Sequence, residues 1–232
     1  MTTTPKIRNS RLPPMERRAD IMAAARSVIA EKGHENISLS EIAQRAGIVE
    51  GTLYRFFENK QEMLSTVVAE WYREVTENAP SVESIRGTWN KLRSLIARDL
   101  KIIKEHPELT RFILAEIRPD PTYTKTIFYK LNRRYADEIK NLCAEAIEKG
   151  EFRDDVSPNL LRDMVFGCIE HSTWAYLRGA GDFPLDETAD GIANVVYEGM
   201  LKQRPTTPSD LAQIAERLET ITSNLEKKLQ QP

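Results

Sequence analysis

The apolar residues of this chain recur at steps of three and four, the spacing that places side chains on one face of an α-helix. No stretch shows the sustained alternation of apolar and polar residues that a half-buried strand requires. The fold class predicted from this pattern is therefore all-α. Helices are expected over residues 17–32, 39–46, 50–57, 60–78, 83–105, 107–117, 121–149, 158–178, 185–203 and 209–229.

One segment near the N-terminus carries the clearest start and stop signals. Ser38 is expected to cap a short helix, and Glu41 stands where its carboxylate would complete a capping box. Gly47 is expected to end that helix, because glycine adopts the left-handed turn without a Cβ clash. Asn59 and Glu62 repeat the capping pattern before the next long helix. Two short helices joined by a glycine turn predict a helix-turn-helix, whose second helix can enter a DNA major groove.

The second helix of this motif is expected to pack inward through three apolar residues, Val49, Leu53 and Phe57. Gly51 costs about 1 kcal/mol against alanine inside a helix, and its expected use is a close approach of the backbone to DNA. Glu50 either accepts a hydrogen bond from a cytosine amino group or simply suits the helix dipole. Arg55 either reads guanine or binds a phosphate.

The order and spacing of these residues resemble the tetracycline-repressor (TetR) family of DNA-binding proteins. The family's fold implies a homodimer, in which each subunit has a small DNA-binding domain and a larger helical domain for ligand binding and dimerisation. The resemblance is strong over about residues 15–75, and it rests on EIA at 41–43, AG at 46–47, GTLY at 51–54, Phe57, and NK at 59–60.

The resemblance also implies roles for individual residues. Thr52 and Tyr54 would bond to phosphates or touch bases, and Lys60 would meet a phosphate at a helix N-terminus, where free N–H groups attract an anion. Val49 stands where the family often has a capping serine, and Glu50 where it has a basic or neutral polar residue. The operator sequence therefore does not follow from the resemblance. The candidate DNA-binding residues are Ser38, Glu50, Gly51, Thr52, Tyr54, Arg55 and Lys60.

Charge divides the chain into two parts. Residues 1–60 carry ten Lys and Arg against seven Asp and Glu, a net charge of +3, whereas residues 61–232 carry twenty-three against twenty-eight, a net charge of −5. A basic N-terminal part suits a nucleic-acid partner. We expect a flexible basic arm over 1–14, the helix-turn-helix domain over 15–60, a ligand-binding and dimerisation domain over 61–203, and a linker with an extra helix over 204–232. The arm either reaches DNA or is a solvated terminus.

Two late helices, 158–178 and 185–203, are rich in apolar and small residues. We expect them to pair with their mates in a second subunit as a four-helix bundle around a two-fold axis. The alternative is that they are ordinary core helices of a monomer. The expected interface residues are Leu161, Met164, Val165, Cys168, Ile192, Val196 and Met200.

Aromatic and charged residues on the helices of the second domain are candidates for a ligand cavity. The alternative for each is a satisfied polar group or a part of the aromatic core. Residues 166–177 and 114–120 resemble the fatty-acid-degradation branch of the family, which implies an acyl-CoA effector. The candidate ligand-binding residues are Phe112, Glu116, Arg118, Tyr123, Glu170, His171 and Trp174.

Signatures of catalytic or metal-binding chemistry are missing from the sequence. It has no nucleophile elbow, no Gly-rich phosphate loop, and no His, Cys and Glu cluster at metal-ligand spacing, so neither an enzyme nor a cofactor is expected. Cys143 and Cys168 are expected to be buried free thiols. No run approaches the ~18 apolar residues of a membrane-spanning helix, so we expect a cytoplasmic protein without a membrane partner.

The expected function is that of a ligand-responsive transcriptional regulator. It would bind a palindromic operator in double-stranded DNA as a homodimer and, as a repressor, would be released by a small hydrophobic or acyl-type effector. A helical small-molecule or lipid carrier without specific DNA binding is the alternative, and the sequence does not separate a repressor from an activator. The C-terminal helix is expected to pack on the partner subunit or on its own body through Leu211, Ile214, Leu218, Ile221 and Leu225.

Overall fold

The computed structural model describes residues 13–32, 37–77, 81–202 and 216–222, and the prediction of an all-α fold is confirmed. Within these ranges the extended structure amounts to one isolated bridge between Phe152 and Leu201. The helices are α1 (Pro14–Lys32), α2 (Leu39–Arg45), η1 (Glu50–Arg55), α3 (Lys60–Glu77), α4 (Thr88–Glu105), α5 (Pro107–Phe112), η2 (Ile113–Ile117), η3 (Tyr123–Lys125), α6 (Ile127–Glu148), α7 (Pro158–Leu177) and α8 (Leu185–Met200).

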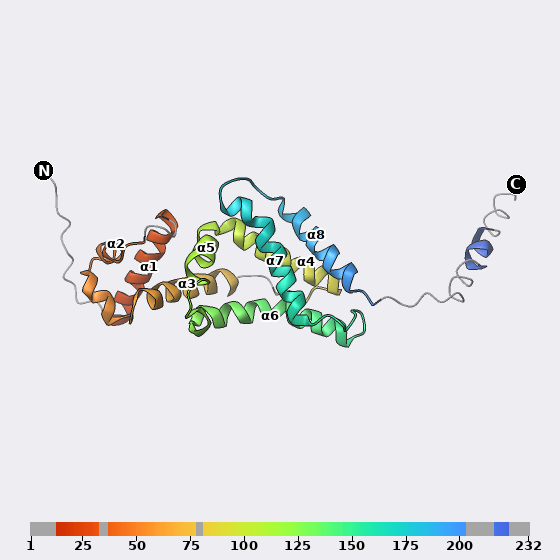
Figure 1. Cartoon of the computed structure of the whole chain (residues 1–232), viewed down its shortest axis with the longest axis horizontal. Coiled ribbons are helices and arrows are strands. Elements are labelled where there is room, and N and C mark those ends of the chain that lie inside the picture. Colours follow the sequence, from red (N-terminus) through yellow and green to blue (C-terminus); the bar gives the residue numbers. More distant parts are fainter. Residues whose placement is uncertain (1–12, 33–36, 78–80, 203–215, 223–232) are drawn as a thin grey trace.

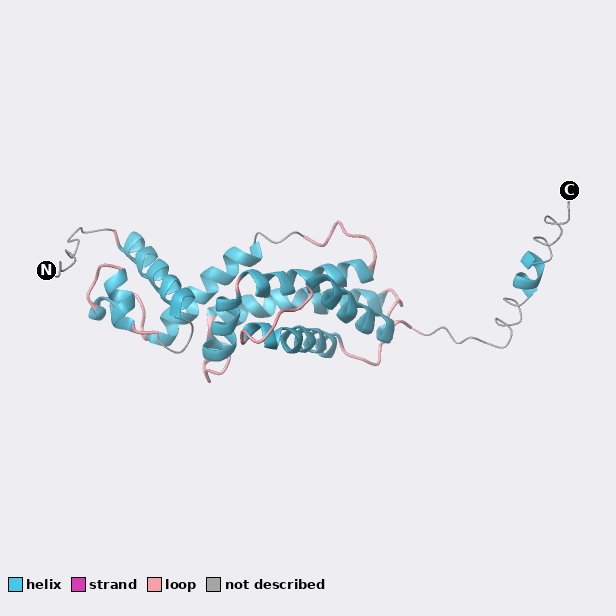
Figure 2. Cartoon of the chain, turned by 90° about the horizontal axis from the view of Figure 1, so that it is seen from above, coloured by secondary structure: helices cyan, strands magenta, loops and turns pink. Residues whose placement is uncertain are grey.

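The helices form a small N-terminal group and a larger bundle that α3 connects. Figures 1 and 2 both show α1 and α2 at one end of the molecule, with α3 running from them into the bundle of α4 to α8. Within the bundle α4 packs along α8, and α6 packs against both α3 and α7. One helix therefore belongs to both parts of the molecule.

Two clusters of buried apolar residues hold this arrangement together. The first joins α1, α2, η1 and α3 to α5 and the start of α6, and it includes the fully buried Phe112 and Phe128. The second lies among α4, α6, α7 and α8. Because the first cluster extends from the N-terminal helices into the larger bundle, α5 shares a hydrophobic core with the helix-turn-helix region.

Gly87 sets the start of α4, and the prediction that this helix begins at residue 83 is wrong. Gly87 has φ of 86°, in the left-handed region where a helix cannot continue, and α4 begins at Thr88 directly after it. The residues before Gly87 form turns.

Thr126 sets the start of α6, and the prediction that Asp120 and Pro121 begin this helix is also wrong. The Asp120 carboxylate accepts a hydrogen bond from the Thr122 N–H at 2.7 Å, which closes a turn. The Thr126 hydroxyl oxygen then accepts from the Tyr129 N–H at 3.1 Å and caps α6. Asp120 and Thr126 are both good capping residues, so local preference alone did not decide between them.

Some expectations lie outside the described residues. The arm over 1–14 does so except for its last two residues, and so does most of the helix expected over 209–229. Residues 216–222 are helical, with Leu218 and Ile221 exposed. Within the described ranges no helix has both the length and the apolar character needed to cross a membrane.

Candidate functional site

The turn between α2 and η1 has the geometry of a helix-turn-helix. Gly47 has φ of 68° and ends α2, as predicted. The Ile48 N–H donates to the Ala43 carbonyl at 2.9 Å, and the Gly47 N–H donates to the Gln44 carbonyl at 3.1 Å. This pair of bonds is the Schellman arrangement, which satisfies carbonyls at a helix end that would otherwise lack a partner.

The second element of the motif is a short 3-10 helix, η1, and not the α-helix expected. Leu53 and Phe57 are buried against α1 to α3, as predicted, whereas Val49 is 64% exposed and the prediction that it packs inward is wrong. Glu50, Gly51, Tyr54 and Arg55 are exposed, and Thr52 is half-buried.

Gly51 has no packing reason of its own to be glycine. A Cβ built at this position meets no atom within 4 Å, and its φ is not positive. The protein's own fold would therefore accept alanine here. The missing side chain leaves room for something outside the chain to approach the backbone.

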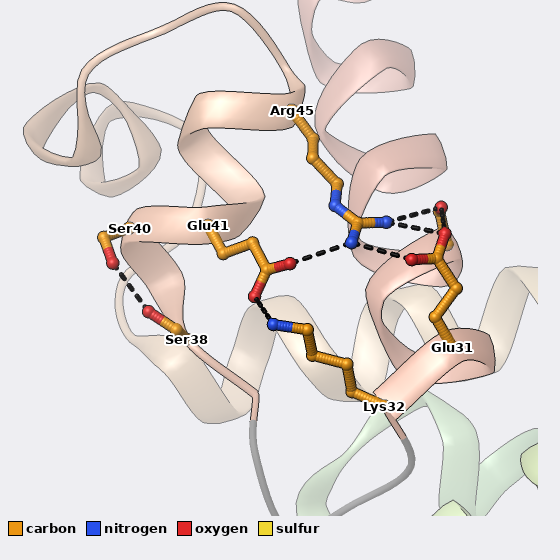
Figure 3. A network of polar contacts seen from close by, with 7 residues as sticks. Glu31, Lys32, Ser38, Ser40, Glu41 and Arg45 are labelled. Carbon is orange, nitrogen blue, oxygen red and sulfur yellow. Dashed lines mark hydrogen bonds and ion pairs between the residues drawn. The ribbon is translucent and has the colours of Figure 1, made fainter.

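The predicted capping box of α2 does not form. The Ser38 hydroxyl lies 2.6 Å from the Ser40 hydroxyl and bonds to no backbone N–H of the helix. Glu41 turns away from the cap and accepts from Lys32 at 2.6 Å and from Arg45 at 2.8 Å (Figure 3). A charged partner outcompetes the backbone for this carboxylate.

Arg45 is the centre of an ionic network that ties α1 to α2. Its guanidinium donates to both Glu31 oxygens at 2.7 and 2.8 Å, to Glu41 at 2.8 Å and to the Ser27 hydroxyl at 2.9 Å (Figure 3). The bond from Arg45 lowers the pKa of Glu31 to about 2, and the bond from Lys32 lowers that of Glu41. Both carboxylates are therefore ionised at neutral pH, and Arg45 is committed to internal contacts.

The start of α3 places Lys60 beside α2. The Asn59 side chain accepts from the Glu62 N–H at 2.8 Å, so this predicted cap is confirmed, while the Glu62 carboxylate accepts from the Glu58 N–H. The exposed Lys60 ammonium donates to the Ile37 carbonyl at 3.1 Å. Lys60 thus connects the residues that open α2 and α3 while keeping its charge at the surface.

A cavity of about 260 Å³ lies in the larger bundle. Side chains from α4, the α5–η2 segment, α6 and α7 surround it, and Tyr72 of α3 completes its wall. Most of the wall is apolar, and its apolar side chains include Ile102, Ile103, Ile113, Leu114, Phe166, Ile169 and Leu177.

Three of the candidate ligand-binding residues, Arg118, Tyr123 and Glu170, line this cavity. Phe112 is fully buried in the first cluster instead, and the remaining three, Glu116, His171 and Trp174, are exposed outside the cavity wall. The sequence pattern missed Tyr72 and Asp99. For Asp99 the sequence did hold a signal that could have found it, namely a single acidic residue within the apolar stripe of α4.

Exposed charged residues mark where the cavity meets solvent. Arg118, Arg133 and Asp163 line it and are exposed. Arg118 pairs with Glu170 at 2.8 Å, whereas Arg133 approaches Asp137 only at 4.0 Å. An anionic group of a ligand could therefore be met at this opening by two guanidinium groups, of which Arg133 is the less engaged.

Polar groups also line the buried part of the cavity. The Tyr72 hydroxyl donates to the Asn132 carbonyl oxygen at 3.2 Å, and the Asn132 amide donates to the Tyr123 hydroxyl at 3.3 Å. Asp99 is 8% exposed, and burial raises its pKa to about 7, although the hydrogen bond from Tyr135 works in the opposite direction.

The helices expected to form a dimer interface, α7 and α8, have an exposed apolar face. Four of the predicted contact residues, Leu161, Val165, Val196 and Met200, are buried within one chain and belong to its second cluster. Ile192 is half-buried, whereas Met164 and Cys168 are exposed, so the expectation of two buried thiols holds for Cys143 alone. The exposed face also carries Leu160, Gly167, His171, Trp174 and Val195.

Fold and site together define a helix-turn-helix DNA-binding regulator with a helical regulatory domain. The chain matches the family described as "Bacterial regulatory proteins, tetR family" over residues 21–67, and "Tetracyclin repressor-like, C-terminal domain" over residues 86–200. The chain belongs to the TetR family of transcriptional regulators.

Its relatives are regulators as well. The fatty acid metabolism regulator protein of Bacillus subtilis is 23% identical over 181 residues, which cover 78% of this chain and 93% of that protein. The transcriptional repressor KstR2 of Mycobacterium tuberculosis is 24% identical, over 81% of this chain and 94% of its own.

Solved structures share the fold. The structure of FadR from Bacillus subtilis in complex with stearoyl-CoA superposes with a TM-score of 0.64 at 22% identity, covering 78% of this chain and 98% of that one. FadR from Bacillus halodurans gives a TM-score of 0.64 at 23% identity, covering 81% and 97%.

The position of Asp99 predicts an unusual pH dependence of stability. Its pKa in the folded protein lies above the usual 3.8, so the folded state binds the proton more tightly than the unfolded state does. Stability should therefore fall as the pH rises from about 4 to about 8, and Asp99→Asn should remove this part of the decline. Urea unfolding of both proteins at several pH values measures the effect.

The control is Asp154→Asn, at an exposed loop position. It should keep the wild-type pH dependence. Equal slopes for wild type and Asp99→Asn across this pH range would show that Asp99 is not held in a costly ionised form.

Proposed function

We propose that this protein is a homodimeric repressor that leaves its operator when an amphipathic effector fills the cavity in the larger bundle. The observation that carries the proposal is the course of α3. This helix begins at Lys60, beside the helix-turn-helix, and its Tyr72 forms part of the cavity wall. A ligand that displaces Tyr72 therefore acts on the same helix that carries the DNA-binding end.

The length of α3 makes a small displacement sufficient. Twelve residues separate Tyr72 from Lys60, which is about 18 Å along a helix axis. A tilt of about 10° at the cavity end would move the other end by about 3 Å by this geometry. Two recognition elements must lie about 34–36 Å apart to meet successive major grooves, so such a shift disturbs operator binding. The ligand achieves this only if it binds the tilted state more tightly.

The cavity wall supports an effector with a long apolar body and an anionic end. The apolar side chains would cover the body, and Arg118 and Arg133 would meet the anion at the opening. An acyl-type effector has this chemistry. The name of a relative, the fatty acid metabolism regulator protein, and the structure of FadR in complex with stearoyl-CoA support the same class.

DNA contacts are proposed for the exposed residues of η1 and for Lys60. Tyr54, Arg55 and Gly51 would meet the groove, and Glu50 would accept from a cytosine amino group. Ser38 and Thr52, both half-buried, would bond to phosphates through their hydroxyl groups. We place the protein in the cytoplasm, where its operator would be, and assign it no catalytic step.

Selection of genomic fragments with the purified protein tests the proposal. A two-fold symmetric site bound by one dimer is expected. Weak binding to all fragments, with no sequence preference, would instead favour a helical ligand carrier.

Lys60→Ala should weaken binding to the selected operator and to unrelated DNA alike. If Lys60 neutralises a phosphate, the slope of log affinity against log salt concentration should fall by about one unit for each subunit. Titration of operator DNA at several salt concentrations measures the slope. Because Lys60 also bonds to Ile37, a purely structural loss would lower affinity at every salt concentration and leave the slope unchanged. Lys130→Ala, exposed on α6, is the matched control.

The exposed face of α7 and α8 is proposed as the dimer interface. Met164 is 50% exposed on α7, and Val195 is 75% exposed on α8. Packing both helices against their mates across a two-fold axis would bury these side chains in a four-helix bundle. The residues buried within one chain, such as Leu161 and Val196, would pack on the opposite side of α7 and α8 and hold the two helices in place.

Met164→Glu should convert the dimer to monomers, because it would bury two like charges near the two-fold axis. Sedimentation analysis at several protein concentrations measures the dissociation, and operator affinity should fall with it. Ala144→Glu, exposed on α6, adds the same charge away from this face and should stay dimeric. A Met164→Glu protein that remains dimeric at the same concentrations would move the interface elsewhere.

A further inference from the structure

Asp99 is the feature of the cavity that an apolar ligand alone does not explain. It lies on α4, is 8% exposed, and lines the cavity together with apolar residues of the same helix, Ile102 and Ile103. Burying a carboxylate is costly unless hydrogen bonds replace the water that it loses. An alkyl chain placed beside Asp99 would displace that water without offering the carboxylate a hydrogen bond in its place.

The neighbours of Asp99 satisfy it only in part. The Arg98 Nε–H donates to the Tyr135 hydroxyl oxygen at 2.9 Å, which leaves the hydroxyl hydrogen of Tyr135 free to donate to Asp99. The Arg98 guanidinium is itself paired with Glu138 at 3.1 Å. Among the described residues, Tyr135 is the one hydrogen-bond donor to Asp99. A carboxylate offers about four acceptor positions, so acceptor capacity remains on the cavity side.

A second polar group lines the buried part of the same cavity. The Tyr72 hydroxyl, on the helix that leads to the DNA-binding end, donates its hydrogen to Asn132 at 3.2 Å. Its oxygen can still accept a hydrogen bond. The buried part of the cavity thus offers an acceptor at Asp99 and a further acceptor at Tyr72, while the guanidinium groups of Arg118 and Arg133 are at the exposed opening. The buried Arg162 also lines the cavity, but its guanidinium is engaged by Asp137, Asn159 and Asp163.

We propose that the effector of this cavity is a hydroxylated long-chain acid, whose acidic end meets the opening and whose hydroxyl group donates to Asp99. This inference rests on the proposed function, because it specifies the chemistry of the effector in that site. The hydroxyl supplies the donor that Asp99 lacks. A neutral hydroxyl group costs less desolvation in this buried site than an ammonium group would.

Discrimination should favour the hydroxylated ligand strongly. A site built around a hydrogen bond to a hydroxyl group rejects the analogue without it, because its own polar group is then buried without a partner. Burial also raises the pKa of Asp99 to about 7, so the carboxyl is ionised in a large fraction of molecules at neutral pH and can accept from the ligand.

The test compares matched pairs of ligands with the full-length dimer. Straight-chain fatty acids of about 8 to 18 carbons and their terminally hydroxylated counterparts are titrated by calorimetry, since the reach from the opening to Asp99 selects one chain length. At that length the hydroxylated acid should bind at least about tenfold more tightly than its parent. Asp99→Leu should reverse the order, and Asp99→Asn should reduce the preference while keeping the shape of the site.

Folding of each variant is checked by its helical circular dichroism and its dimeric state, and Asp154→Leu, at an exposed loop position, serves as the surface control. Equal affinities within every pair for the wild-type protein would overturn this inference while leaving an acyl-type effector in place. The same applies to a hydroxyl preference that survives in Asp99→Leu. Failure of every acid in the series to bind would also overturn this inference, and stearoyl-CoA titrated alongside would show separately whether an acyl-type effector still binds.

Discussion

The burial of α3 on two sides is the constraint on which the rest of this structure depends. Trp71 and Tyr72 are neighbours on the helix and both are buried, yet they contact different helices. The guanidinium carbon of Arg26, on α1, lies 4.7 Å from the centroid of the Trp71 ring. The Tyr72 ring instead packs edge-on against Phe128 and Tyr135 of α6, with distances of 5.3 and 5.6 Å between ring centroids. Close-packed side chains have few alternative arrangements. We therefore expect a displacement at the cavity end of α3 to be transmitted to its DNA-binding end.

The cavity lies where this packing is interrupted. The groups that border it include Asp99 and Tyr72, both buried and both polar, and only part of their hydrogen-bonding capacity is met within the chain. Outside the cavity wall, Ser65 is the buried polar residue among the described residues, and charged groups such as Arg45 with Glu31 are paired at the surface. In natural proteins a buried polar group without a hydrogen-bond partner in the chain occurs mainly at functional sites, where a ligand can supply the partner.

Much of the fold follows from local chemistry that a sequence displays. The helical class, the left-handed turn at Gly47, the cap at Asn59 and the inward side chains Leu53 and Phe57 all depend on neighbours within one or two turns. The capping box at Ser38 failed because its carboxylate partner meets distant charges on α1. Such a competition becomes visible only when the helices are placed.

The cavity was harder to predict, because its lining depends on the rotation of each helix about its axis. In the η2 segment the Arg118 N–H bonds to the Ile113 carbonyl, five residues earlier, at 2.9 Å. This π-type turn holds an extra residue and shifts every later side chain relative to a regular helix. Phe112, before the turn, packs in the first cluster, and Arg118, after it, lines the cavity. Sequence periodicity carries no sign of that shift.

The most direct test of the central claim is a reciprocal titration of one protein with two ligands. Operator affinity is measured with and without saturating stearoyl-CoA, and stearoyl-CoA affinity is measured with and without operator DNA. If α3 couples the cavity to the DNA-binding end, each ligand should weaken the other by the same factor, because coupling free energies are reciprocal. Tight binding of stearoyl-CoA with unchanged operator affinity would contradict the account.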